Sequence, residues 1–129
     1  MSKSVKESCL EIDFQDFFQE DTMTLKMNDC IVFENLVLTS SQSTGLTNVQ
    51  VFAYEYSAGL ISLKLVLWGD SDKEVCRLKK NEVYHAEIIL NGQMVSFELF
   101  LGRGKYFGFS KKGEADLYFN QSQIPFEYD

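Results

Sequence analysis

Hydrophobic and polar residues alternate along most of this chain, which is the period of a β-strand that buries one face. Such runs flank short turns and predict hairpins: 22–27 with 30–39 across Asn28-Asp29, 49–56 with 61–68 across Ser57-Ala58-Gly59, and 84–90 with 95–101 across Asn91-Gly92. Asn-Gly is the strongest of these turn signals, because both residues of a type I′ turn need a positive φ. Further strands are expected at 106–110 and 115–120, and 74–80 fits a strand or one helical turn.

Two segments depart from this simple alternation. Within 30–39 the apolar residues shift from odd positions, ending at Phe33, to even positions, starting at Leu36, which predicts a β-bulge near Glu34-Asn35. Over 14–20 the phenylalanines at 14, 17 and 18 recur at i, i+3 and i+4, which predicts one short N-terminal helix.

About eight short strands without a long helix predict an all-β fold, an antiparallel β-sandwich that is jelly-roll-like or immunoglobulin-like in outline. Residues 1–21 are expected to form an acidic, aromatic arm packed on a single sandwich domain of residues 22–129. Eleven Phe among 129 residues supply enough bulky side chains for the core of such a domain.

The net charge of −7 argues against nucleic acid as a partner, since binding to phosphates needs clustered Lys and Arg. Residues 1–63 hold most of the excess, with three basic and nine acidic residues. No apolar run approaches the roughly 18 residues of a membrane span, so no membrane partner is expected.

The three cysteines, Cys9, Cys30 and Cys76, are odd in number and lack C-x-x-C spacing. Neither a disulfide framework nor a structural zinc site is expected from this count. Residues 1–8 also lack the apolar core of a signal peptide. These features favour a location in the reducing cytoplasm.

The sequence contains no recognisable catalytic motif. His85 is the only histidine, and it lies within a predicted strand without a recognisable catalytic motif around it. We therefore expect a structural or solvent-exposed His85, no enzymatic activity and no cofactor.

Two loops agree weakly with known binding motifs. Asp70, Asp72 and Glu74 space carboxylates as calcium loops do, but Lys73 interrupts them and the EF-hand pattern is absent. The Gly102-Arg103-Gly104-Lys105 stretch contains the glycines of a phosphate loop, but a strand rather than a helix is expected after it. A solvated turn and a tight connection explain both segments, so no metal or phosphate site is expected.

Phe52, Tyr54 and Tyr56 share one face of a predicted strand, and Trp68 has the same phase on the next strand. If the small apolar residues at 49, 51 and 53 face the core, these rings form an exposed aromatic surface of the kind found at interfaces and ligand platforms. Two alternatives are open: the aromatic face is itself the core, or both faces of this strand are covered.

Asp13, Asp16, Glu20 and Asp21 surround the phenylalanines of the 14–18 segment. Carboxylates beside aromatic rings can steer and hold a basic partner. In the alternative, this segment packs its rings on the sandwich and leaves its acids in solvent.

These features favour a small acidic protein-binding module of the inhibitor, immunity or adaptor kind, with a basic protein as its expected partner. The alternative is a carbohydrate-binding sandwich in which Tyr54, Tyr56 and Trp68 stack on sugar rings. A homodimer formed through the aromatic face is also compatible with the pattern.

Overall fold

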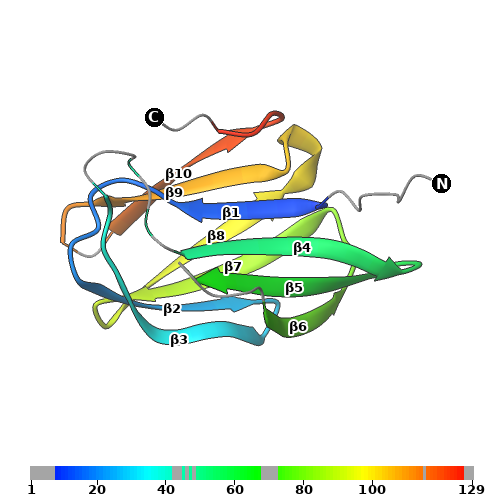
Figure 1. The fold of residues 1–129 in the computed structure, drawn as a ribbon, viewed down its shortest axis with the longest axis horizontal. Coiled ribbons are helices and arrows are strands. Elements are labelled where there is room, and N and C mark those ends of the chain that lie inside the picture. Colours follow the sequence, from blue (N-terminus) through cyan, green and yellow to red (C-terminus); the bar gives the residue numbers. More distant parts are fainter. Residues whose placement is uncertain are drawn as a thin grey trace.

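The chain folds into two β-sheets packed face to face (Figure 1). The computed structural model describes residues 8–41, 45, 47, 49–67, 73–114 and 116–126. The strands are β1 (Leu10–Phe14), β2 (Asp21–Met27), β3 (Cys30–Leu38), β4 (Val49–Ser57), β5 (Leu60–Leu67), β6 (Lys73–Lys79), β7 (Val83–Leu90), β8 (Gln93–Phe100), β9 (Tyr106–Lys112) and β10 (Asp116–Ser122), and one short 3-10 helix, η1 (Leu101–Arg103), follows β8.

The larger sheet has six strands in the order β10-β9-β1-β4-β5-β6, and the smaller has four in the order β3-β2-β7-β8. Neighbouring strands are antiparallel except β1 and β9, which pair in parallel. The predicted all-β sandwich is confirmed, and 74–80 contributes a strand rather than a helical turn. Within the described residues no helix has the length and hydropathy needed to cross a membrane.

The predicted turns and the bulge are present where the sequence indicates them. Asn28 and Asp29 have φ of 46° and 67°, and Asn91 and Gly92 have 50° and 84°, as two-residue hairpin turns of the I′ kind require. In the β2–β3 pair the register shifts between Met23 and Leu25, so that Glu34 and Asn35 together oppose Thr24. The Asn35 N–H donates to Thr24 Oγ1 at 3.0 Å, which satisfies a donor that the bulge removes from the ladder.

The core lies between the sheets and is rich in phenylalanine. The Phe14 ring stacks on Phe109, 5.9 Å between centroids, and contacts Phe33 of the other sheet edge-on at 5.7 Å. Fully buried side chains come from the inner faces of both sheets, among them Leu10, Ile12, Met23, Leu25, Met27, Ile61, Leu63, Tyr84, Ile88 and Phe107. This burial fixes which face of each strand points inward.

The helix predicted over Phe14–Glu20 is wrong. Phe14 ends β1, and residues 15–20 cross irregularly from the larger to the smaller sheet. Phe17 and Glu20 have φ of 72° and 50°, values that a right-handed helix does not contain. The i, i+3, i+4 spacing arises because Phe14 points inward from a strand and Phe18 turns back to the core, whereas Phe17 is 69% exposed.

Residues 10–14 of the expected arm form β1, which lies between β9 and β4 inside the larger sheet (Figure 1). Its parallel partner β9 is almost a hundred residues further along the chain, with Glu11 opposite Tyr106. The N-terminal segment is therefore part of the framework that carries the outer face of this sheet.

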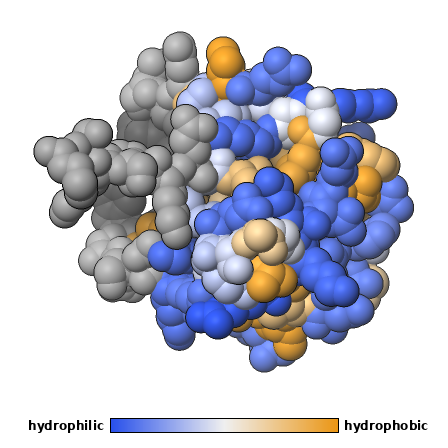
Figure 2. Space-filling view, turned by 90° about the vertical axis from the view of Figure 1, so that its right-hand side faces the viewer, coloured by the Kyte–Doolittle hydropathy of each residue, from blue (hydrophilic) through white to orange (hydrophobic). Residues whose placement is uncertain are grey.

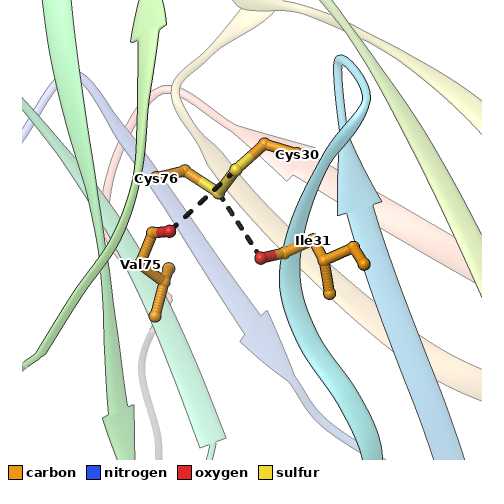
Figure 3. Close-up of a disulfide and its surroundings, with 4 residues drawn as sticks. All are labelled: Cys30, Ile31, Val75 and Cys76. Carbon is orange, nitrogen blue, oxygen red and sulfur yellow. Dashed lines mark hydrogen bonds between the residues drawn. A yellow bond between two sulfur atoms is a disulfide. The ribbon is translucent and has the colours of Figure 1, made fainter.

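The cysteine count predicted no disulfide framework, but Cys30 and Cys76 are joined by a disulfide bond that this count did not indicate (Figure 3). Their Cα atoms lie 6.2 Å apart, within the ordinary range for a disulfide. Cys30 begins β3 and Cys76 lies in β6, so the bond links the edges of the two sheets. The odd cysteine count conceals this pair because Cys9 remains free.

Removing this crosslink is expected to destabilise the fold. The bond closes a segment of 46 residues, for which the chain-entropy model gives up to about 4 kcal/mol. We expect the double substitution Cys30→Ser and Cys76→Ser to lower the free energy of unfolding by about 2–4 kcal/mol in urea titrations. Reductant should shift the wild-type midpoint similarly and leave the double variant unchanged, with Cys9→Ser as the matched control. A wild-type midpoint that ignores reductant would contradict the assignment.

Candidate functional site

Phe52, Tyr54 and Tyr56 lie on the outer face of β4, and they define what we call the aromatic strip. Val49, Val51 and Ala53, which alternate with them, are at most 1% exposed and face the core. This excludes the alternative in which the aromatic side is the core, although Phe52 and Tyr54 are half-buried on the outer side rather than fully exposed. The Phe52 and Tyr54 rings are nearly parallel, with an interplanar angle of 26° and centroids 6.4 Å apart, while Tyr56 at the strand end is 39% exposed.

Cations lie along one side of the aromatic strip. Lys64 of β5 places its Nζ 5.7 Å from the centre of the Tyr54 ring, and the Arg77 guanidinium of β6 lies 5.0 Å from that of Tyr56. The Arg77 Nε donates to Glu74 Oε1 at 2.9 Å, and Ser62 donates to the other carboxylate oxygen. The Ser62 hydrogen bond, followed by that of Arg77, lowers the pKa of Glu74, so this carboxylate stays charged and holds Arg77 beside Tyr56.

Carboxylates lie along the opposite side of the aromatic strip. On β1, Glu11 is opposite Phe52 and Asp13 is opposite Gln50, whose Nε2 donates to Asp13 Oδ1 at 2.8 Å. Beyond Glu11, Tyr106 of β9 adds a further ring on the same outer face. The aromatic strip therefore lies between an acidic row on β1 and a basic row on β5 and β6, into which Glu74 brings one carboxylate that is bound to Arg77. We call this whole surface the aromatic face.

The structure does not gather the four predicted acids into one site. Asp13 lies on the aromatic face, whereas Asp16 and Glu20 are exposed on the 15–20 crossing. Phe17, which protrudes between them, was not among the predicted site residues. Its exposure could not be read from a spacing that also fits a buried helix face. Trp68 lies outside the described residues.

Asp21 is buried in a network between the sheets rather than presented to a partner. It accepts hydrogen bonds of 2.8 Å from Lys111 Nζ, Asn91 Nδ2 and the Gln19 N–H. Its side chain is 5% exposed, and that of Lys111 is 17% exposed. Burial by itself raises the pKa of the Asp21 carboxyl, but the hydrogen bonds from Lys111, Asn91 and Gln19 together outweigh it and leave the pKa lowered.

The other candidates that the sequence suggested do not assemble a site. His85 is exposed, and its Nδ1 lies 3.7 Å from the exposed Glu98 carboxylate. Asp70 and Asp72 lie outside the described residues, among which no group of three or more potential metal ligands is found. Lys105 of the glycine-containing connection donates to the Ser8 carbonyl at 2.7 Å, and Gly104, with a φ of 138°, packs against the Ser122 backbone where any side chain would collide.

Cys9, the free cysteine, is a partly buried thiol that lies just before β1 and packs against the core. Burial raises its pKa, and the thiol donates to the Ala53 carbonyl at 3.3 Å. It is therefore protonated near neutral pH, whereas a nucleophilic cysteine needs a lowered pKa.

We expect low pH to lower the stability of the fold because Asp21 becomes protonated. Because its folded pKa lies below the ordinary value of 3.8, its contribution is complete above that value and is lost as the pH falls through the folded pKa. We expect Asp21→Asn to cost about 1.5–3 kcal/mol at pH 7 and to flatten the dependence of stability on pH below about 4. Urea titrations from pH 7 to pH 2.5 measure both effects, with the exposed Glu20→Gln as the control. Parallel pH profiles for wild type and Asp21→Asn would contradict this role.

Viewed from the end where β4 turns into β5, the described surface is mostly hydrophilic, with apolar residues in small separate areas (Figure 2). Among the described residues seen from this end, no broad apolar patch competes with the aromatic face. The chain matches no protein-family model, no curated protein and no solved structure. The support for the candidate site is therefore the geometry of its own residues.

Proposed function

We propose that this chain is a protein-binding module that holds its partner on the aromatic face. The observation that carries the proposal is the aromatic strip itself: Phe52, Tyr54 and Tyr56 point away from the core on an interior strand. Aromatic side chains supply a large contact area with few rotatable bonds, so little side-chain entropy is lost when a partner covers them.

The charges on either side of the aromatic strip favour a partner that carries opposite charges in a matching arrangement. Glu11 and Asp13 form the acidic row, and Lys64 and Arg77 form the basic row. A complementary protein would set cations against β1 and carboxylates against β5 and β6, which favours one orientation over its reverse. The net charge of −7 further favours the approach of a basic protein.

A carbohydrate-binding role is the alternative function. It is favoured by the nearly parallel Phe52 and Tyr54 rings, since flat aromatic surfaces also suit sugar rings. Catalysis is not part of the proposal. The expected cytoplasmic location is retained only as a hypothesis, and the Cys30–Cys76 bond weighs against it because disulfides persist mainly in oxidising compartments.

The proposal predicts that substitutions on the aromatic strip abolish partner binding. The tagged chain is used to isolate a stoichiometric partner from its host, and the purified pair is then titrated by calorimetry. Tyr56→Ala is expected to weaken binding about tenfold or more, and the triple substitution Phe52→Ser, Tyr54→Ser and Tyr56→Ser to remove it. Circular dichroism and thermal melts confirm that each variant is folded.

The matched control is the pair Val37→Ser and Ile31→Ser, which removes exposed apolar side chains from β3 of the other sheet. This control should bind the partner as the wild type does. Equal affinities for the wild type and folded Tyr56→Ala would overturn the proposed site. Retention of isolated saccharides on a glycan array, lost in the triple variant, would instead support the carbohydrate alternative.

A further inference from the structure

β8 is an edge strand of the smaller sheet and lies apart from the aromatic face, which belongs to the larger sheet. Because Asn91-Gly92 is a two-residue turn, Leu90 and Gln93 exchange both backbone hydrogen bonds, and odd-numbered residues of β8 continue this pairing with β7. The even-numbered residues direct their N–H and C=O groups outward. Two contacts agree with this assignment: the Leu101 N–H donates to the Glu82 carbonyl at 2.8 Å, and the Phe100 carbonyl accepts from Gln121 Nε2 at 2.6 Å.

The outward backbone groups of Met94, Ser96 and Glu98 have no hydrogen-bond partner within the described part of the chain. The strand keeps a continuous register with β7 over eight residues. It carries no Lys, Arg or Pro and no bulge, which are the usual features that prevent another strand from pairing with an edge.

The edges on the opposite side of the sandwich are protected. β6 carries Lys73, Arg77 and Lys79, and all three are exposed. β3 contains the bulge at Glu34-Asn35 and is tied to β6 by the disulfide. Strand addition is therefore disfavoured on that side, whereas at β8 none of these protective features is present among the described residues.

The larger sheet has two more strands than the smaller one, and it therefore extends past the edge strand β8. The Phe97 ring lies 5.2 Å from Phe109 of β9 and 5.4 Å from Phe119 of β10, measured between centroids. β8 therefore lies over the boundary between β9 and β10, and β10 extends past it. Val95, Phe97 and Phe119 are only partly buried as a result. A strand added beside β8 would lie over β10 and cover these side chains.

The charges select the kind of strand that fits. β8 and β10 contain no basic residue, and their acids Glu98 and Asp116 are exposed, as is Glu114 before β10. If a second copy of this chain paired through its own β8, it would bring the same acids to the contact, and the two projecting β10 strands would meet there. Symmetric pairing is therefore disfavoured by charge and by shape.

We propose that the β8 edge accepts one extended, basic segment of a partner protein, whose alternate apolar residues cover Phe97 and Phe119. The added segment hydrogen-bonds to Met94, Ser96 and Glu98 and extends the smaller sheet by one strand, which is the mode of β-strand addition. This inference does not rest on the aromatic face, and its failure would leave that proposal standing.

The test uses the full chain, labelled with ¹⁵N, and an end-blocked synthetic peptide of about ten alternating Val and Lys residues. Amide exchange by NMR should show that the Met94, Ser96 and Glu98 amides exchange fast in the free chain and slow on addition of the peptide. The Val95, Phe97 and Leu99 amides should be slow in both states. A peptide of equal composition with its valines in one block has the same charge without the alternation, and it should give no such protection.

Two variants separate backbone pairing from general attraction between opposite charges. Ser96→Pro removes an outward N–H without breaking the β7 pairing and should weaken peptide binding about tenfold or more. Ser96→Thr keeps that N–H and should bind as the wild type does, and so should the triple variant of the aromatic strip. Should Ser96→Pro be unfolded, Ser96→Lys keeps every backbone group, repels the basic peptide and should also weaken binding.

Alternating protection along β8 that Ser96→Pro or Ser96→Lys removes would support the proposal. Protection confined to β10 or to the aromatic face, or equal binding by a folded Ser96 variant, would overturn it. Concentration-dependent protection of Ser96 and Glu98 in the free chain would also overturn it, because a second copy would then occupy the edge.

Discussion

The burial of alternate residues of β4 is the constraint on which the rest of the account depends. Val49, Val51 and Ala53 face the core, so Phe52 and Tyr54 must face outward on a strand that has neighbours on both sides. A slip of one residue would exchange the two faces, placing large rings in a space filled by small side chains. The pairing with β1 and β5 then fixes which charges lie beside the rings, because Glu11 and Lys64 both face Phe52.

The two sheets are held together differently at their two sides. At one side the Cys30–Cys76 bond ties β3 to β6, while at the other the Phe97 ring packs against β9 and β10. Asp21 and Lys111 add an ion pair from β2 to β9. The covalently closed side has a basic, protected edge, and the side held by aromatic contacts leaves β8 open. Among the described residues, the fold thus presents an aromatic face on the larger sheet and a separate unpaired edge on the smaller one.

Local patterns in the sequence predicted the local structure well. The turns at Asn28-Asp29 and Asn91-Gly92, together with the bulge at Glu34-Asn35, follow from conformational preferences that act within a few residues. The outward orientation of the aromatic strip was predicted only on condition that the small apolar residues faced the core. Alternation along a strand defines two faces, but it does not show which of them is buried.

Features that depend on distant residues were missed. The interior position of β1 depends on a parallel pairing with β9, and the burial of Asp21 depends on Lys111, ninety positions away. The disulfide joins cysteines whose separation of 46 residues carries no recognisable motif. The open edge of β8 becomes visible only once the strand order is known, since no property of the segment itself shows which neighbours it lacks.

The most direct measurement of the central claim is the solvent accessibility of tyrosine rings, using ¹⁹F NMR of 3-fluorotyrosine-labelled chain with a soluble paramagnetic probe. Single Tyr→Phe variants assign the signals, and Tyr84, which is 0% exposed, serves as the internal buried reference. We expect strong broadening for the exposed Tyr56, weaker but clear broadening for the half-buried Tyr54, none for Tyr84, and protection of the first two once a partner is bound. Broadening of Tyr54 and Tyr56 as weak as that of Tyr84 would contradict the outward orientation of the aromatic strip and the binding function built on it.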